Sequence, residues 1–400
     1  MNKSRRKIKS MYTIYKSLVQ LVTSGLLSFI LLQPVYAQQG LNLKDVSGFS
    51  DSRHHWMDIT DHEQVIVPAK DQKSYNPSNV REIADNILLY QQHNGGWPKN
   101  YDMLAILTDD QKKTLTEHTD SNHTTFDNGA TYTQIEYLAK AFTLLKDERY
   151  RQASLRGLSF ILKAQYANGG WPQFYPDVSG YRKYITFNDG AMVGVMTVLQ
   201  HINQNASYYS FIDDELRQQV KRSFEKGIDC ILKCQVTEDG KLTVWCQQHD
   251  NITLKPTGAR TFELASLASE ESTQIVELLM NIQHPDAKVI AAVKGAVDWF
   301  RQVAIPGIRV KTVPAKEVVY KFHASNNDRV VVDDPSAPPI WTRYYELKTN
   351  RPFFADRDGK AVYKLSDVSR ERRTGYGWYG YWPASIINSV YPKWLEHISK

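Results

Sequence analysis

The feature that most constrains the fold of this chain is a phrase of eight residues that recurs along it. The phrase reads Gln91-x-x-Asn94-Gly95-Gly96-Trp97-Pro98, and it returns 74 positions later as Gln165-x-x-Asn168-Gly169-Gly170-Trp171-Pro172. A degenerate third copy runs from Gln235 through Asp239-Gly240 to Trp245. Each copy follows a stretch that can form an amphipathic helix, and the paired glycines mark where a helix stops. Repeats of this length indicate stacked helical hairpins.

A second phrase alternates with the first and opens each new helical stretch. Thr125-Phe126-Asp127-Asn128-Gly129-Ala130 is echoed by Thr186-Phe187-Asn188-Asp189-Gly190-Ala191, and Pro256-Thr257-Gly258-Ala259 is a candidate third member. The helices predicted after these three turns are Thr131–Leu145, Met192–Ile202 and Thr261–Leu267.

The two alternating phrases together predict a mainly α fold. Hairpins that close into a ring form an α/α toroid, a barrel of helical hairpins whose repeated turns emerge on one rim; an open helical stack is the alternative. From Arg309 onward, valine-rich stretches and prolines predict short strands and extended loops. We therefore expect a smaller irregular, β-containing portion that covers one rim, with a short helix near Ile386–Trp394.

The residues before the repeats divide into two parts. Six Lys/Arg, an apolar stretch from Leu18 to Leu32 and the small-residue end Val35-Tyr36-Ala37 are typical of a secretory signal peptide, with cleavage after Ala37. A membrane anchor is the alternative, but polar residues interrupt the stretch and no second span follows. The polar residues 38–75 predict an irregular lead-in to a folded module at 76–400. The mature protein is expected to be secreted or periplasmic, free of membrane and monomeric.

The charge of the chain gives no support for a nucleic-acid partner. The formal net charge is +6, but residues 1–37 hold six Lys/Arg and no acid, so 6 − 6 leaves the mature chain near zero. The three cysteines are odd in number and have no histidines at zinc spacing, so we expect buried small side chains. They are Cys230, Cys234 and Cys246.

The acidic residues of the repeated turns are the first candidates for a functional site. Asp127 and Asp189 each precede a predicted helix, where Asp is a common N-cap. The shared frame in which the Asp changes place favours a second role, because a cap would also tolerate Ser or Thr. Two carboxylates on one rim could bind Ca²⁺. They could equally serve as the acid/base pair of an inverting glycoside hydrolase.

A cation at the third turn favours the calcium interpretation. Arg260 follows Gly258-Ala259 where an acid would otherwise be expected, with Lys255 five residues before it. It could be a surface cation or a partner of Glu263. A cationic group beside a calcium site would instead suit an anionic sugar, whereas a hydrolase gives Arg260 no task. A terpene-cyclase-like toroid and a non-catalytic carbohydrate-binding module fit the sequence less well.

Several phrases, taken together, resemble polysaccharide lyase family 10 over roughly residues 75–395. They are Asn94-Gly95-Gly96-Trp97-Pro98, Phe126-Asp127-Asn128-Gly129-Ala130-Thr131, Lys255-Pro256-Thr257-Gly258-Ala259-Arg260, Thr349-Asn350-Arg351-Pro352 and Glu371-Arg372-Arg373-x-Gly375-Tyr376-x-Trp378-Tyr379. The resemblance implies a pectate lyase module with an α/α toroid, calcium dependence and polygalacturonate as substrate. Module 76–400 would then be the catalytic module.

The resemblance also implies roles for individual residues. Arg260 falls at the family's catalytic base, Asp127 and Asp189 at acidic positions around calcium, and Asn128 and Arg351 at substrate-binding positions. Lys255 and Arg343 are added as substrate-binding candidates because they lie close to matched motifs. An arginine base needs its charged form disfavoured, and a nearby divalent ion, other cations and desolvation all act in that direction.

Overall fold

The computed structural model describes residues 41–59, 64–117 and 123–399, and the fold is that of the unit Leu43–Lys400. The predicted signal peptide lies outside the described residues. Within them, no helix combines the length and the apolar composition needed to cross a bilayer.

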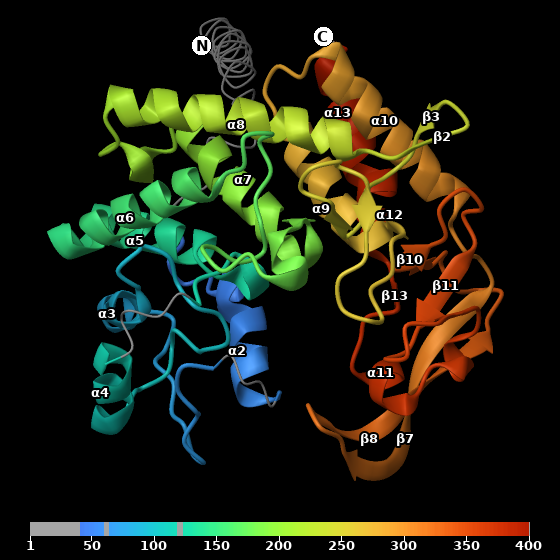
Figure 1. Cartoon of the computed structure of the whole chain (residues 1–400), viewed down its shortest axis with the longest axis horizontal. Helices are drawn as coiled ribbons and strands as arrows, with labels where there is room; N and C mark the ends of the chain where they lie inside the picture. The colour runs from blue at the N-terminus through green and yellow to red at the C-terminus, as the bar shows by residue number, and fades with distance from the viewer. Residues whose placement is uncertain (1–40, 60–63, 118–122, 400) are drawn as a thin grey trace, which may run out of the picture. The chain divides into compact units, whose positions relative to one another are not determined.

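The described chain is mainly helical, and its helices are paired as hairpins (Figure 1). Helix α3 (Val80–Tyr90) precedes the first hairpin and packs on α5. The three hairpins are α5 (Tyr132–Leu145) with α6 (Glu148–Ala164), α7 (Ala191–Asn203) with α8 (Asp214–Cys234), and α9 (Ser269–Met280) with α10 (Ala287–Gln302). The predicted stacking of helical hairpins is thus present.

Each second helix of a hairpin begins at an aspartate cap. The side chains of Asp147, Asp213 and Asp286 accept hydrogen bonds from backbone N–H groups in the first turns of α6, α8 and α10. Such caps satisfy donors that have no partner inside the helix and contribute about 1 kcal/mol each.

The recurring phrase forms the same contacts in all three copies. Each Gln amide donates to a carbonyl of its own loop and to a carbonyl of a long helix, and each Trp indole donates to the helix that precedes it. The Gln bonds are Gln91 to Gly95 and Ala153, Gln165 to Gly169 and Ser223, and Gln235 to Thr243 and Ala292, all 2.9–3.0 Å. The Trp bonds are Trp97 to Ile87, Trp171 to Ile161 and Trp245 to Ile231, at 2.8, 2.9 and 2.7 Å. The third copy is therefore a structural repeat despite its degenerate sequence.

The first glycine of each intact phrase permits a close approach between loop and helix. Gly95 and Gly169 have φ values of +95° and +93°. A Cβ at these positions would lie 2.4 Å from the carbonyl oxygen of Arg156 and 2.1 Å from that of Lys226. Both the left-handed backbone and the missing side chain are needed here, because any larger residue would separate the loop from the helix.

The helix predicted at Thr261–Leu267 is wrong. The chain there forms a tight loop that ends in strand β6 (Leu267–Ala268), and α9 begins only at Ser269. Within this loop the backbone N–H of Glu263 bonds the carbonyl of Arg260, and Phe262 is buried in a second apolar cluster. The local apolar pattern therefore reflects loop packing and strand pairing, which override helix periodicity.

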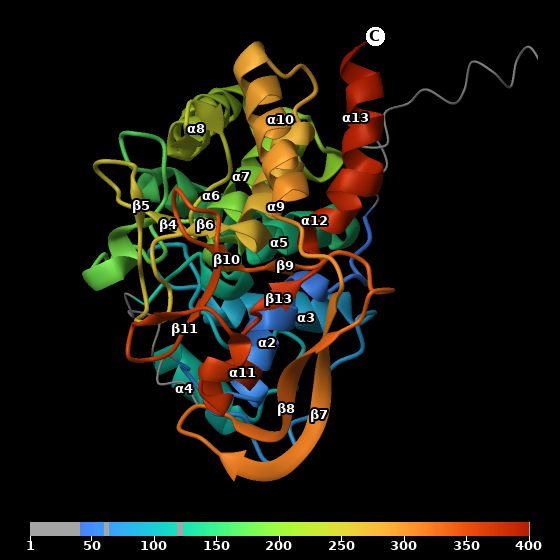
Figure 2. The same ribbon diagram turned by 90° about the vertical axis from the view of Figure 1, so that its right-hand side faces the viewer.

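The C-terminal portion contains strands at the valine-rich stretches, as expected, but the first two are long, with 12 and 10 residues. A long hairpin of β7 (Ile308–Val319) and β8 (Ala324–Asp333) curves beside α11 (Arg370–Thr374), as Figure 2 shows. The shorter strands are β9 (Trp341–Thr342), β10 (Tyr344–Tyr345), β11 (Pro352–Ala355), β12 (Ala361–Val362) and β13 (Tyr379–Gly380).

The chain ends in helical segments near the predicted terminal helix. These are α12 (Trp382–Ser385), a π-helical turn (Ile386–Val390) and α13 (Tyr391–Ile398).

The lead-in contains a helix that the sequence did not reveal. Helix α2 (Ser50–Met57) lies inside the stretch expected to be irregular, and it packs against the first repeated turn. Phe49 and Trp56 fix it to the core, where both side chains are buried. Its polar sequence carries little apolar periodicity, so only tertiary packing specifies it.

The three cysteines are free and buried, as predicted.

Candidate active site

Two repeated turns meet at the start of their helices. Asp127–Gly129 and Asn188–Gly190 each form one turn of 3-10 helix, and the two turns pack against each other. The middle residue of each turn, Asn128 or Asp189, has a left-handed backbone with φ of 50°. Asn and Asp tolerate this conformation better than other non-glycine residues. Asp127 therefore corresponds to Asn188, and Asn128 to Asp189.

Neither aspartate caps a helix. The N-cap positions of α5 and α7 are Thr131 and Gly190, and neither helix has a side-chain cap bond. The capping role falls instead on the three aspartates of the second helices described above. Another function must account for the acids in the turns.

Asp127 is a neutralised carboxylate. Its Oδ2 is 2.7 Å from Lys99 Nζ, and its Oδ1 accepts a hydrogen bond of 2.9 Å from the amide of Gln173. Burial alone would raise the pKa of Asp127, but the charge and hydrogen bond of Lys99, with the bond from Gln173, outweigh it and hold the pKa below its ordinary value. Asp127 is thus ionised and matched by a cation of the protein itself.

Asp189 is the opposite case. Burial, followed by the negative charges of Asp127 and Asp51, raises its pKa well above the ordinary value. Arg343 and Arg260 act in the other direction but do not compensate. Among the ion pairs of the described residues, none includes Asp189, whose carboxylate accepts from the amide of Asn188. The ionised form of Asp189 is therefore disfavoured, and a cation bound beside it would stabilise that form.

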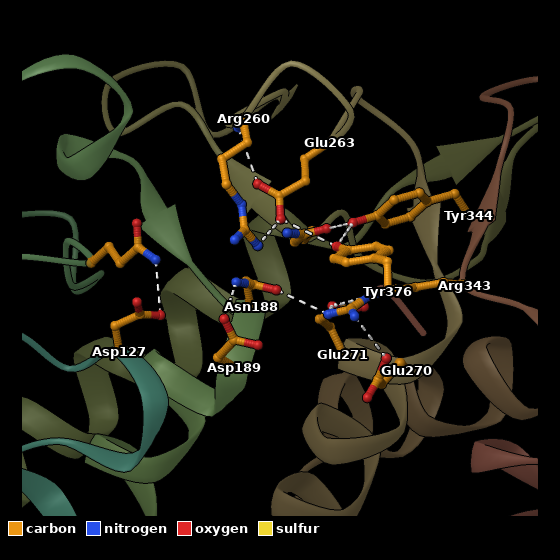
Figure 3. Close-up of polar contacts among 12 residues, drawn as sticks. Asp127, Asn188, Asp189, Arg260, Glu263, Glu270, Glu271, Arg343, Tyr344 and Tyr376 are labelled. Atoms are coloured by element: carbon orange, nitrogen blue, oxygen red, sulfur yellow. Dashed lines mark hydrogen bonds and ion pairs between the residues drawn. The ribbon is translucent and has the colours of Figure 1, made fainter. Parts of the chain in front are cut away.

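Arg260 reaches the same region through a small sheet. Strands β1 (Ile185–Thr186), β4 (Gln248–His249) and β5 (Pro256–Thr257) pair in that order, so the loop that follows β5 lies beside the turn that follows β1. Figure 3 shows the guanidinium end of Arg260 pointing toward Asn188 and Asp189. The sheet explains how residues about 70 positions apart in sequence come together on one rim.

Arg260 also pairs with Glu263, as one interpretation of the sequence allowed. Glu263 accepts hydrogen bonds from both the backbone N–H and the guanidinium of Arg260, whose side chain is 40% exposed. Burial would lower the pKa of Arg260, as expected from the sequence, but the carboxylate of Glu263 outweighs it and the pKa lies well above the ordinary value. The described residues therefore hold Arg260 protonated.

Arg343 is buried and its guanidinium is fully engaged. Its Nε donates to Glu271 Oε1 at 2.9 Å, its Nη1 lies 3.2 Å from Glu270 Oε2, and its Nη2 donates to Asn188 Oδ1 at 2.9 Å. Only 7% of the residue is exposed. The pairing of β6 with β10 brings these elements together. In this arrangement Arg343 holds the second turn in place, and Nε, Nη1 and Nη2 all have protein partners rather than a substrate carboxylate.

Sequence reasoning missed Glu270 and Glu271, which stand at the third repeat. Burial is the main cause that raises the pKa of Glu270 to about 7; Arg343 opposes it, whereas Glu271 and Asp51 add to it. Two backbone contacts identify the position. Ala268 N–H bonds Trp245 O as Thr125 N–H bonds Trp97 O, and Trp245 N–H bonds Ser272 Oγ as Trp97 N–H bonds Thr131 Oγ1. The available signal was a pair of adjacent acids at the start of the first helical stretch after Trp245.

The remaining predicted residues lie in three different surroundings. Asn128 is buried and donates to Asn100 Oδ1 at 2.8 Å, which makes it part of the turn's framework. Lys255 is exposed at the start of β5, in the segment that leads to Arg260. Arg351 is exposed on the turn between β10 and β11, with its guanidinium 3.3 Å from the ring centroid of Tyr363. Only Asp127, Asp189 and Arg260 gather with the engaged Arg343.

The described protein side chains do not by themselves make a complete metal site. Calcium takes six to eight oxygen ligands, and no group of three or more His, Cys, Asp or Glu in the described residues could hold a metal ion. The charge of Asp189 is opposed by burial and by Asp127 and Asp51. Both oxygens of Asp127, in contrast, already accept hydrogen bonds, from Lys99 and Gln173. This donor set fits a calcium ion that takes its remaining ligands from water and from an anionic substrate.

Comparisons with known proteins show which family the chain resembles in sequence and structure. The sequence model of a family described as pectic acid lyase matches residues 91–387. The structure is similar to that of a family 10 polysaccharide lyase from Cellvibrio cellulosa, with 34% identity, a TM-score of 0.67, and 80% of this chain and 93% of that chain covered. It is also similar to an aspartate-to-alanine mutant of such a lyase in complex with trigalacturonic acid, with 34% identity, a TM-score of 0.66, and 78% and 92% of the two chains covered. Among curated protein sequences, none matches the chain.

Proposed function

This chain belongs to the pectic acid lyase family and is a pectate lyase of polysaccharide lyase family 10, and from this premise we propose that it cleaves α-1,4-polygalacturonate by calcium-assisted β-elimination. Arg260 is the proposed base and 4,5-unsaturated oligogalacturonates are the products. The observation that carries the proposal is the meeting of Arg260 with the electrostatically uncompensated Asp189 on one rim.

The substrate class is supported by the comparison. The similar lyase from Cellvibrio cellulosa was captured with trigalacturonic acid, and we assign galacturonate oligomers to this chain on that basis. Each galacturonate carries a carboxylate, so a rim that pairs arginine with a cation-seeking aspartate suits it.

The reaction begins with removal of the proton on C5 of a galacturonate and ends with loss of the oxygen at C4. A calcium ion held by Asp189, with Asp127 nearby, would neutralise the substrate carboxylate and make the C5 proton more acidic. Arg260 takes the C5 proton on the side where its guanidinium points toward Asp189. Because Glu263 keeps Arg260 protonated in the free enzyme, only a small neutral fraction acts, and activity should rise toward alkaline pH.

Export and ring closure complete the proposal. The sequence before Gln38 supports a secreted or periplasmic enzyme that is released by cleavage after Ala37. The threefold recurrence of the Gln and Trp contacts supports closure of the hairpins as an α/α toroid.

An inverting glycoside hydrolase has one specific observation in its favour. The pKa of Asp189 is raised and that of Asp127 is lowered, which is the pattern of an acid/base pair. The two chemistries differ in their products. Elimination leaves a conjugated double bond, whereas hydrolysis takes up water and leaves none.

The decisive experiment follows both products at once. The purified mature protein should produce ultraviolet-absorbing ends in step with reducing ends on polygalacturonate, and chelation should stop both until Ca²⁺ is returned. Reducing ends without matching absorbance would replace the lyase with the hydrolase.

The base assignment is tested by Arg260→Lys, which keeps the charge but shortens the reach and loses the planar fork. A positioned base contributes ~10²–10⁴-fold, so kcat should fall by that order while KM changes little. Arg301→Lys, an exposed arginine on α10 paired with Asp298, is the control and should leave both parameters unchanged. Near-normal kcat in Arg260→Lys would mean that another residue is the base.

A further inference from the structure

A buried carboxylate, that of Glu263, accepts two hydrogen bonds from the proposed base, Arg260. Glu263 is 2% exposed, and its carboxylate is hydrogen-bonded by Arg260, Tyr376 and Gln247. Its Oε2 accepts from Arg260 N–H at 3.0 Å, and its Oε1 accepts from Arg260 Nη2 and from the hydroxyl of Tyr376 at 3.1 Å (Figure 3). One carboxylate thus binds both ends of the same arginine.

The tyrosine connects this arrangement to the rest of the rim. The hydroxyl groups of Tyr376 and Tyr344 are 2.6 Å apart, and the Tyr376 ring lies 4.7 Å from the guanidinium carbon of Arg343. Phe262 supports Arg260 from another side, with its ring centroid 5.0 Å from the guanidinium carbon. Tyr376 therefore connects Glu263 of the loop with Tyr344 and Arg343.

An ion pair with a buried carboxylate and a half-exposed guanidinium contributes little to stability alone. Desolvation of a carboxylate and a guanidinium costs about as much as their attraction returns, and apolar residues of similar size often stabilise as well or better. The closed contact with backbone and side chain does, however, leave the arginine with few orientations. Hydrogen bonds between charged groups are both stronger and more directional than neutral ones.

We propose that Glu263, supported by Tyr376, is the positioning residue that fixes the orientation of the Arg260 guanidinium toward the substrate. The proposal rests on the elimination reaction proposed above and adds a residue to it. Because Nη2 is bound to Glu263, the remaining guanidinium nitrogens are the ones available to face the C5 proton. Glu263 itself does not touch the substrate.

The same contact has a predictable effect on pH dependence. The charged and titratable groups that act on Arg260 or respond to it are Glu263, Tyr376, Asp189, Asp127 and Tyr181. Glu263 is the largest of the influences that raise the pKa of Arg260. Removal of its charge should lower that pKa, so the rising limb of the pH–rate profile should move to lower pH. A purely structural role would leave the limb where it is.

The first test is Glu263→Gln, which keeps size and one acceptor but removes the charge. We expect kcat to fall about 10- to 100-fold, the scale of a hydrogen bond between charged groups, with KM within about twofold of its original value. The rising limb of the pH profile should shift to lower pH. Glu148→Gln is the matched control, because Glu148 forms an exposed i,i+3 pair with Arg151 on α6 and should change neither quantity. An unchanged limb together with unchanged kcat would overturn the proposal.

The second test is Tyr376→Phe, which keeps the ring beside Arg343 and removes the hydroxyl with its contacts to Glu263 and Tyr344. We expect a kcat loss of severalfold, smaller than in Glu263→Gln, with a smaller displacement of the pH limb, since the charge of Glu263 remains. If Glu263→Gln fails to fold by circular dichroism, this variant decides alone, and a wild-type kcat would sink the proposal. The unsaturated product of the unmodified enzyme tests the lyase function separately, so the two ideas fail independently.

Discussion

The two repeated turns share a backbone and differ in what they do with a carboxylate. In the first turn the acid is the leading residue, Asp127, and a lysine of the protein neutralises it at 2.7 Å. In the second turn the acid is the middle residue, Asp189, whose pKa is raised by burial and by Asp127 and Asp51 despite the opposing charges of Arg343 and Arg260. The frame sets where a carboxylate can stand, and the surroundings decide whether the protein or an external cation balances its charge.

This comparison shows what a shift of one position achieves. Both middle positions adopt the same left-handed conformation, which Asn and Asp tolerate alike. The exchange of Asn and Asp between the two turns therefore costs the backbone little and relocates a negative charge. In this way one copy of an internal repeat can carry a carboxylate that pairs within the protein, while the other carries a carboxylate available to a bound cation.

Among the variants that test the difference between the two turns, Asp189→Ala should have the largest effect. If Asp189 is the acid that requires an external cation, activity should fall by about 10²–10³-fold or demand far more Ca²⁺, with unchanged helical circular dichroism. Asp213→Ala removes a genuine cap from α8 and is the contrasting control, with about 1 kcal/mol of stability lost and specific activity retained. A variant that unfolds yet keeps normal specific activity in its folded fraction would assign Asp189 to the fold instead.

A smaller effect is expected from Lys99→Met, which makes the first turn resemble the second. With Lys99 gone, Asp127 loses its neutralising cation, so its pKa should rise and its affinity for Ca²⁺ should increase. Titration calorimetry without substrate should show Ca²⁺ binding that is severalfold tighter than in the unmodified protein. The control is Lys140→Met on α5, which breaks a pair with Glu136 and should leave Ca²⁺ binding alone. Unchanged binding in Lys99→Met would contradict the idea that Lys99 occupies the role of a cation at Asp127.

The smallest effects are the opposite stability changes of Asp189→Asn and Asp127→Asn. The raised pKa of Asp189 destabilises the fold once pH climbs above the ordinary value of 3.8, so Asp189→Asn should be stabilising at neutral pH and neutral in acid. The lowered pKa of Asp127 contributes stability above 3.8 that is lost as pH falls through its folded value, so Asp127→Asn should be destabilising at neutral pH. Thermal midpoints recorded from acid to neutral pH should show shifts on the order of 2 °C. Shifts of the same sign would show that the two environments do not differ as described.

The sequence predicted the parts of this molecule that depend on local pattern. Helical hairpins follow from apolar periodicity and glycine stops, and the phrase around Trp97 is informative because its Gln, Gly and Trp each make a contact that recurs. The convergence of Asp127 and Asp189 on one rim was predictable for the same reason. Repetition in sequence implies equivalence in space.

What the sequence did not reveal depends on contacts between distant segments. Helix α9, which follows the third turn, starts at Ser269 because the residues before it form β6 and pair with β10. That pairing joins segments far apart in the sequence, so local pattern does not predict it. Arg343 looked like a substrate ligand, although Glu270 and Glu271, more than 70 positions earlier, occupy its guanidinium. Helix α2 was missed because six of its eight residues are polar and it is held by the burial of Phe49 and Trp56 and by packing on the first repeated turn.

The loop that carries Arg260 and Glu263 lies between two strand pairings, β5 with β4 at its start and β6 with β10 at its end. The ends of this segment are held by backbone hydrogen bonds between strands, which do not depend on the side chains between them. Loop exchange between relatives could therefore install a different base, or none, without redesign of the hairpins. The identity of the base would then vary with the loop, while the helical hairpins that position the loop stay the same.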